Sequence, residues 1–382
     1  MDNTIPVNSV YIHIPFCLHK CPYCDFVSLP LSQHQSCREA YAGLLRSELD
    51  LWRGSFSDTP LDFSRLRTIY FGGGTPSLME PDEIGSILGL LPAAEEITLE
   101  ANPETLDRGK LAAFRLAGVN RLSLGAQSFE PRLLAAMGRG HSPADTRRVV
   151  NEARQEGFAN ISIDLIYGLP DQNLAGWQAD LQQALALDTQ HISLYGLALE
   201  PHTPWGEQAA TGRLQLPDED SQADMLELAC DVLEQAGFIH YEIANFARPG
   251  WESLHNHAYW QRDNYLGLGV AAASCLFERR FYNQKNLTAY RRLIEVGRPP
   301  LLDEEWLNID QVISEALFLG LRLLAGIDFT AFYGRYGVDP RRRYRREIER
   351  LWEKGLIELD KQGMRLTRRG LLLGNEVFRA FV

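Results

Sequence analysis

Three cysteines near the start of the chain stand close enough in sequence to share one metal centre. Cys17, Cys21 and Cys24 lie within the segment HIPFCLHKCPYCDF (13–26), where their spacing is C-x3-C-x2-C. The three remaining cysteines are scattered along the chain. In a reducing compartment, a tight group of thiols indicates metal ligation and not a disulfide framework.

Three thiolates suit an iron–sulfur cluster with one free iron. They can hold three corners of a [4Fe–4S] cube, and S-adenosylmethionine (SAM) can chelate the fourth iron through its amino and carboxylate groups. One electron then cleaves the sulfonium and gives a 5′-deoxyadenosyl radical. The alternative is structural zinc, which takes four ligands, usually from two C-x2-C pairs. No second pair is present, although His13 or His19 could supply a fourth ligand, so the spacing favours the cluster.

Two further segments could bind such a cofactor. In GGGTPS (72–77) the glycines lack side chains, so the backbone can approach a ligand closely. The alternative is a tight strand-to-helix turn, but the cysteine motif favours binding. Glu100 ends an expected strand, where a carboxylate can accept hydrogen bonds from ribose hydroxyls. Its alternative is a solvated loop carboxylate.

The second half of the chain contains the segment HNHAYW (255–260). His255 could be an axial ligand of haem iron, and Tyr259 and Trp260 could stack on a porphyrin face. A core aromatic cluster with a hydrogen-bonded histidine explains the same residues, and on the residues alone it is the better interpretation.

A scaffold must bring these residues together, and the first 200 residues have a regular pattern. Short apolar runs alternate with segments of helical periodicity, which is typical of parallel strands joined by crossover helices. The runs are almost continuously apolar, so burial on both faces is expected. Six strands are expected, at 10–14, 68–71, 97–100, 121–125, 161–168 and 191–197. Six units predict a partial (β/α)6 barrel or an open sheet, with the unusual residues at the carboxyl ends of the strands.

The pattern changes near residue 240, so we expect two domains. Residues 1–240 form the α/β core with the cluster and the SAM site, and residues 241–382 form a C-terminal domain. Within that domain, 241–305 is expected to be a loop region that carries HNxxYW. The remaining residues, 306–382, predict a mainly helical module with a short hairpin at 356–370, which resembles a winged helix.

Composition sets limits on the function. The chain has 382 residues, 45% of them hydrophobic, and a formal net charge of -12, which counts against a nucleic-acid partner. Apolar runs are too short for a transmembrane helix, and the first residues lack the pattern of a secretory signal. A cytoplasmic location is the expectation.

Several spaced motifs together resemble the oxygen-independent coproporphyrinogen III oxidase family of radical SAM proteins. Beside Y-x-H-I-P-F-C-x3-C-x-Y-C, they are GGGTPS (72–77), EANPE (100–104), LGAQSF (124–129), GRGH (138–141) and IDLIYGLP (163–170). The resemblance spans nearly the whole chain and implies a [4Fe–4S] cluster and SAM as cofactors. It also implies which residues contact SAM, in a family whose members can carry two SAM sites: Tyr11, Tyr23, Gly73, Gly74, Thr75, Glu100, Gln127, Arg139 and Asp164.

Two branches of this family share the cluster motif, and three features separate them. The oxidase branch has C-x3-C-x2-C-x-C, whereas Phe26 follows Cys24 at the fourth position. Only sixteen residues precede Cys17, which leaves no room for the longer N-terminal arm of the oxidase. HNHAYW resembles the motif associated with haem binding in the haem-chaperone (HemW-like) branch.

The resemblance therefore favours a haem chaperone, a binding and transfer protein, over the alternative of an oxidase that converts two propionates to vinyl groups. It implies haem as cargo, with His257 as an extra candidate ligand. The implied recipient is a respiratory membrane enzyme, which would place the protein at the periphery of the inner membrane. The haem contacts that it implies are His255, Asn256, Tyr259 and Trp260. The cluster motif by itself does not show radical chemistry on a substrate.

Overall fold

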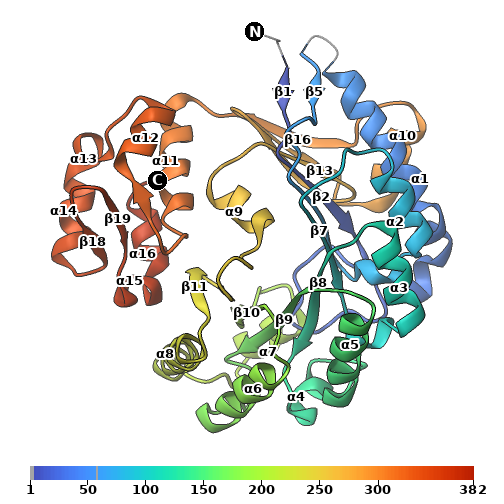
Figure 1. Ribbon diagram of the computed structural model, residues 1–382, viewed down its shortest axis with the longest axis horizontal. Coiled ribbons are helices and arrows are strands. Elements are labelled where there is room, and N and C mark those ends of the chain that lie inside the picture. Colours follow the sequence, from blue (N-terminus) through green and yellow to red (C-terminus); the bar gives the residue numbers. More distant parts are fainter. Residues whose placement is uncertain (1–3, 57–58) are drawn as a thin grey trace.

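The computed structural model describes residues 4–56 and 59–382 and is built on one twelve-stranded sheet. Its six central strands are all parallel. Figure 1 shows that they curve into an open arc with helices on the outer face. This is the predicted partial (β/α)6 barrel. In spatial order the six strands are β2 (Ser9–Ile14), β6 (Thr68–Gly73), β7 (Glu96–Ala101), β8 (Arg121–Gln127), β9 (Asn160–Tyr167) and β10 (His191–Gly196).

The helices between these strands begin at clear sequence signals. Asp107 accepts a hydrogen bond from the third amide of its helix, and Ser142 with Asp145 forms a capping box at another helix. Their apolar faces cover the outside of the sheet, so the strands are buried on both sides. The helices between the strands are α1 (Leu31–Ser55), α2 (Pro81–Leu88), α3 (Arg108–Ala117), α4 (Pro131–Ala136), α5 (Pro143–Gln155) and α6 (Leu174–Ala186), and α7 (Pro204–Ala210) and α8 (Glu219–Gln235) follow β10.

The stretch from 241 to 305 extends both edges of the sheet, and the expectation that it is loop-rich is wrong. At the β10 edge β12 and then β11 pair antiparallel, while at the β2 edge β13 pairs parallel and β14 to β16 follow antiparallel. A domain boundary after residue 240 would pass through β11. The elements are β11 (Ile239–Glu242), β12 (Asn245–Ala247), α9 (Leu254–Trp260), β13 (Tyr265–Leu268), β14 (Ala273–Leu276), β15 (Arg279–Asn283), α10 (Leu287–Glu295) and β16 (Leu301–Trp306).

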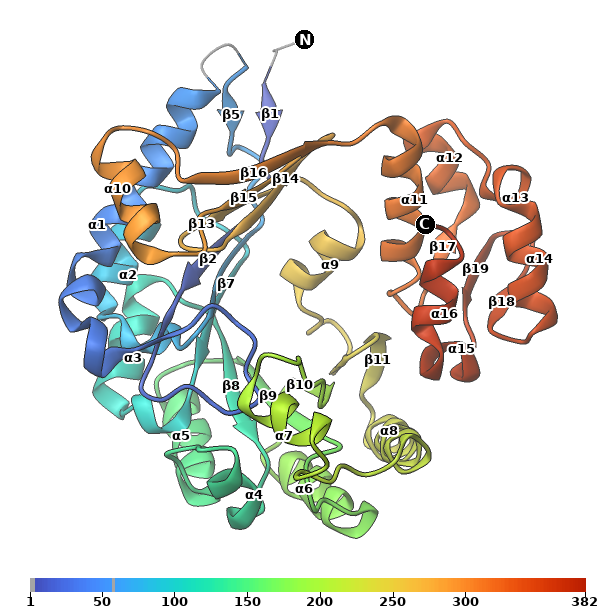
Figure 2. The ribbon, with the colours of Figure 1, turned by 180° about the vertical axis from the view of Figure 1, so that it is seen from behind.

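Helix α9 lies inside the arc, between the sheet and the last part of the chain, as Figures 1 and 2 both show. HNHAYW is therefore helical, and the prediction of a loop there is wrong. The helix has Ser253 at its N-cap, where the hydroxyl accepts a hydrogen bond from the Asn256 amide. A seven-residue helix is too short to show a helical period in the sequence.

The C-terminal part is a separate module with its own apolar core and a three-stranded sheet in the order β17-β19-β18. The hairpin β18–β19 is the predicted wing, and the winged-helix-like expectation is confirmed. No helix in the described part of the chain is long and apolar enough to cross a membrane. The module contains α11 (Ile309–Gly320), β17 (Ile327–Asp328), α12 (Phe329–Tyr336), α13 (Pro340–Arg343), α14 (Arg345–Glu353), β18 (Ile357–Leu359), β19 (Gly363–Leu366), α15 (Arg368–Leu372) and α16 (Gly374–Arg379).

Candidate functional site

The three cysteines lie on one loop at the carboxyl ends of the parallel strands. The loop follows β2, and its ends are joined because β3 (Phe16–Cys17) pairs with β4 (Leu29–Pro30). All three thiols are free and half-buried, and all three line one cavity of about 490 Å³, here called the cluster cavity. Parallel α/β folds place their chemistry at this end of the sheet.

The glycine segment after β6 lies directly against the cysteine loop. The Gly74 amide donates to the Ile14 carbonyl at 2.8 Å, and the Thr75 hydroxyl approaches Cys17 Sγ at 3.6 Å. A Cβ on Gly74 would lie 2.7 Å from the Phe16 carbonyl oxygen and 3.0 Å from Cys17 Sγ. Only glycine allows this approach, so the segment holds the cysteine loop as well as facing the cavity.

Arg139 connects the cysteine loop to the carboxyl ends of β7 and β8. Its Nη1 lies 3.7 Å from Cys21 Sγ, and its Nη2 donates to Asn102 Oδ1 at 2.5 Å and to the Gly125 carbonyl at 2.9 Å. The Asn102 amide in turn donates to Thr75 Oγ1 at 3.2 Å. Cys17 and Cys21 thus face an O–H and an N–H donor, and such contacts orient and tune thiolates that ligate iron.

Two buried carboxyl groups form the opposite side of the cluster cavity. Glu100 accepts hydrogen bonds from the Tyr70 hydroxyl at 2.8 Å and from the Gly73 amide at 3.1 Å. Burial, together with the nearby charge of Asp164, raises the pKa of Glu100 to about 7. Asp164 accepts from the Ser123 hydroxyl at 2.9 Å, and burial also raises its pKa. Such acids can accept hydrogen bonds from hydroxyl or ammonium groups of a bound cofactor.

The structure brings eight of the nine predicted SAM contacts to this cavity. Tyr11 is the exception, because its hydroxyl bonds to His13 Nδ1 at 3.2 Å and its ring lines a different cavity. The sequence analysis missed Tyr195, which is the penultimate residue of β10 as Glu100 is of β7, and this place near a strand end could have identified it. The cavity is lined, among others, by Tyr23, Gly73, Gly74, Thr75, Glu100, Gln127, Arg139 and Asp164, by His19, which the sequence suggested only as a zinc ligand, and by the unpredicted Asn102, Ser123 and Tyr195.

A second cavity of about 590 Å³ lies between the cysteine loop, α9, strands β13 to β15 and α11. Two of the haem contacts that the sequence suggested, Tyr259 and Trp260 of HNHAYW, line this cavity. The Arg322 guanidinium lies over the Trp260 ring at 4.4 Å from its centroid. Asp25 and Phe26 line both cavities, and the Phe26 side chain is 64% exposed. The residue that replaces a cysteine of the oxidase motif thus stands where the two cavities meet.

His255 does not reach either cavity. It is 1% exposed, its Nδ1 bonds to Thr68 Oγ1 at 2.7 Å, and its Nε2 bonds to the Tyr259 hydroxyl at 2.9 Å. Thr68 donates its own proton to Ser9 Oγ at 2.9 Å, so the histidine Nδ1 is the donor and its Nε2 accepts. Burial lowers the pKa of His255 to about 3, and the ring is neutral.

The position of His255 in the barrel also indicates a structural role. Thr68 and Ser9 are the first residues of β6 and β2, so His255 lies at the amino ends of the strands, opposite the cluster. Residues at that end of a barrel usually serve stability. Ligation of haem iron by His255 stays a prediction that this geometry does not support, because both ring nitrogens are already bonded. Asn256 also lies outside the lining of both cavities.

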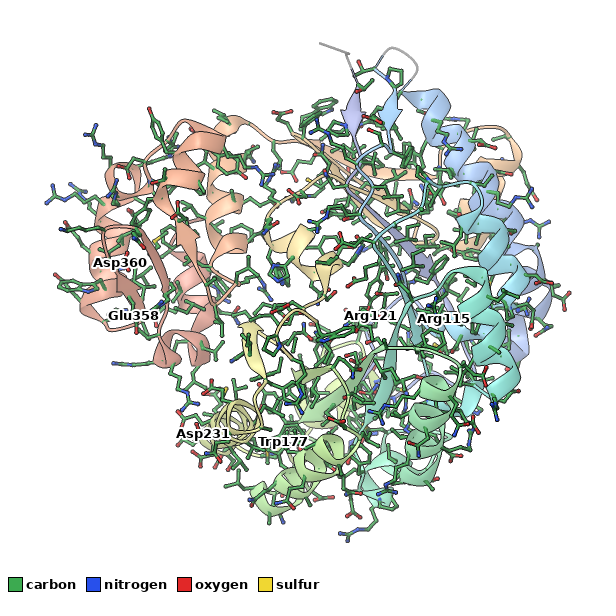
Figure 3. The ribbon with its side chains drawn as sticks, viewed as in Figure 1. Arg115, Arg121, Trp177, Asp231, Glu358 and Asp360 are labelled. Atoms are coloured by element: carbon green, nitrogen blue, oxygen red, sulfur yellow. The ribbon has the colours of Figure 1, made fainter. Side chains whose placement is uncertain are left out.

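The start of α9 is held by a buried carboxylate. Glu96, the first residue of β7, accepts hydrogen bonds from the backbone amides of Leu254 at 3.0 Å and His255 at 3.2 Å. Arg121 lies 4.0 Å from Glu96 and is labelled in Figure 3 within the arc, whereas Arg115 lies on the outer helix. Arg121 therefore compensates the charge of Glu96. By holding the first turn of α9, Glu96 helps to position Tyr259 and Trp260 farther along the same helix.

Comparison with known proteins agrees with this geometry. The Radical SAM superfamily matches residues 11–184, and the HemN C-terminal domain matches residues 307–373. Over 383 residues, the chain is 37% identical to the Bacillus subtilis protein named Heme chaperone HemW, covering 98% of this chain and 99% of that one. This chain belongs to the HemW family of radical SAM proteins. The match includes both cavities.

A further HemW protein and the solved structure of a different protein, HemN, are also similar to this chain. The Escherichia coli protein named Heme chaperone HemW is 38% identical over 275 residues, which is 70% of each chain. The solved structure of coproporphyrinogen III oxidase HemN from Escherichia coli, described as a radical SAM enzyme, superposes with a TM-score of 0.83 at 26% identity. That superposition covers 99% of this chain and 90% of HemN, so this chain and HemN share one architecture.

Proposed function

We propose that this protein is a haem chaperone that binds haem in the second cavity and transfers it to an acceptor protein. The observation that carries the proposal is the placement of Tyr259 and Trp260 in a large cavity that meets the cluster cavity at Phe26. Aromatic side chains can stack on the flat, apolar ring of haem. The names of the relatives support the same function.

The cluster cavity fits a [4Fe–4S] cluster and SAM. Cys17, Cys21 and Cys24 would hold the cluster, which supplies an electron for cleavage of the SAM sulfonium. Thr75 and Arg139 keep two of the sulfurs in position through hydrogen bonds. Tyr23 packs against Trp205 of α7 at 5.6 Å between ring centroids and shields the loop from water.

Glu100 and Asp164 supply the acceptors of the cluster cavity. Both are partly buried, and both receive hydrogen bonds from neighbouring hydroxyls that fix their orientation. Both line the cavity that SAM would occupy. In our proposal they accept hydrogen bonds from the hydroxyl and amino groups of SAM, and Gly73 and Gly74 let the backbone come close to it.

The alternative, a coproporphyrinogen oxidase, is not favoured. The chain shares the HemN architecture, but Phe26 replaces the fourth motif cysteine, and the identity to the Bacillus subtilis HemW protein is 37% against 26% to HemN. The test compares two assays on the purified protein with its cluster reconstituted under anaerobic conditions. Saturable, stoichiometric haem binding with no vinyl product from coproporphyrinogen III supports the chaperone. Substantial conversion of coproporphyrinogen III would overturn it.

The acceptor is proposed to be a respiratory membrane enzyme, which would bring the protein to the inner membrane as a peripheral partner. Transfer to such an enzyme requires the haem to be reachable from outside. The second cavity is bounded by the C-terminal module through Glu315 and Leu319 of α11, so the module is well placed to change access to it. Haem transfer to membranes that contain the apo-acceptor, compared with membranes without it, tests this part.

A further inference from the structure

The second cavity is lined by both aromatic and basic side chains. Phe26 of the cysteine loop lines it together with Tyr259 and Trp260 of α9. Three cations also line it, namely Arg280 on β15, Lys285 after that strand and Arg262 after α9. A flat apolar ligand that carries anionic groups matches this combination. Haem has this chemistry, because its two propionates stand side by side at one edge of the ring.

The charges leave capacity for an anion. Glu315 of α11 forms ion pairs with both Arg262, at 2.8 Å, and Arg280. Arg280 also pairs with Glu305 at 3.5 Å, so two carboxylates face the two guanidinium groups. Each guanidinium has five N–H donors, which is more than these ion pairs use. Lys285 is exposed and forms no ion pair within residues 4–56 and 59–382. Lys285 therefore adds one positive charge beyond those that Glu305 and Glu315 neutralise. Asp25, the other acid of the cavity lining, lies against His202.

We infer that Arg280 and Lys285 bind the two propionate groups of haem, which rests on the proposed function. Arg280 suits one carboxylate because its planar group can bind bidentately once the propionate takes the place of Glu305, its more distant partner, while Arg262 keeps its bond to Glu315. Lys285 lies at the open side of the cavity and supplies a mobile point charge for the second. Neither residue belongs to HNHAYW, so the motif would hold the ring and the β15 region would fix its orientation.

The strand β15 provides a matched control. Successive side chains on a strand point to opposite faces, so Arg279 and Arg280 point apart. Arg279 pairs with Glu304 at 2.8 Å and stacks on Phe281 at 5.1 Å, and it does not line the cavity. Arg279→Gln and Arg280→Gln therefore remove the same charge from adjacent positions, and only Arg280→Gln removes it from the cavity.

The test titrates the holoprotein with haem and with haem dimethyl ester, followed by the Soret band. We expect Arg280→Gln and Lys285→Gln each to weaken haem binding about tenfold, the value of one lost charged hydrogen bond. Neither should affect binding of the ester, and Arg279→Gln should leave both affinities within about twofold. Circular dichroism melting establishes that the variants fold.

The possible outcomes separate the two proposals. If the wild-type protein binds haem but binds the ester equally well, or if Arg280→Gln and Lys285→Gln behave like Arg279→Gln, propionate recognition at this site is refuted while the chaperone proposal stands. If the wild-type protein binds neither compound, the proposed function itself fails. Selective loss of haem binding in the two variants supports both.

Discussion

Replacement of His255 tests whether the HNHAYW histidine holds Tyr259 in place or ligates haem iron directly. His255 bonds Thr68 through one ring nitrogen and Tyr259 through the other, and both bonds are in the interior. His255→Gln keeps one donor and one acceptor at similar reach, whereas His255→Ala removes both and leaves a cavity. We expect His255→Ala to cost about 3 kcal/mol in the free energy of unfolding, and His255→Gln to cost much less.

The dependence on pH gives a sharper measure. Burial lowers the pKa of His255 from 6.5 to about 3 in the folded state. A group with a depressed folded-state pKa favours unfolding when it is protonated, so its contribution is complete above about pH 6.5 and is lost as the pH falls. Between about pH 7.5 and about pH 5.5 the loss is about 1.4 kcal/mol from this ring alone, by the linkage relation.

The assay is urea unfolding of the wild-type protein and His255→Gln at the two pH values. Other buried histidines contribute equally to both proteins, so the difference between the two pH dependences isolates His255. We expect the wild type to lose about 1.4 kcal/mol more than the variant. Equal pH dependences would refute the assignment of a buried, neutral ring.

The haem spectrum provides the second part of the test. Because His255 reaches neither cavity, the Soret maximum of bound ferric haem should be the same in His255→Gln and in the wild type. A shifted maximum, with unchanged stability, would mean that the imidazole leaves its two partners and coordinates the iron. That result would restore the interpretation that the sequence motif first suggested.

Three further predictions concern the cluster cavity. Replacing Cys17, Cys21 or Cys24 by Ala should abolish cluster assembly, and normal iron and sulfide content in any of them would contradict the assignment. Gly74→Ala should lower the iron content, because its Cβ would lie 2.7 Å from the Phe16 carbonyl oxygen; Gly43→Ala in α1, with no atom within 4 Å of the new Cβ, is the control and should leave it unchanged. Arg139→Gln should make the reduction potential of the cluster more negative, since it removes a cation at 3.7 Å from Cys21 Sγ; an unchanged potential in an EPR-monitored titration would argue against this contact.

The sequence predicted the central barrel well because its strands are long, apolar and buried on both faces. It also predicted most of the cluster cavity, since strand ends in a parallel sheet converge on one edge. The edge strands after residue 240 were missed because they are short, three to six residues, and because they join the sheet only through the pairings of β12 with β10 and of β13 with β2. A short run of this kind has no reliable period.

Two site residues could not be placed from sequence for a related reason. Tyr11 precedes the cysteines by only six positions, but its side chain leaves β2 toward the second cavity. His255 carries the residue type of an iron ligand, and only the positions of Thr68 and Tyr259 show that both nitrogens are engaged. Residue type defined the possible chemistry in each case, and tertiary contacts decided which possibility applies.

The pairing of β13 with β2 has a consequence for how the chain folds during synthesis. Tyr265 aligns with Ser9, so the β2 edge of the barrel stays open until residues well past the middle of the chain have been made. Contacts between such distant segments close slowly, and open strand edges promote aggregation. The cysteine loop begins where β2 ends, so its base gains its final support only with this late pairing. A nascent chain that stops near residue 240 would therefore present the cysteines on an incomplete barrel.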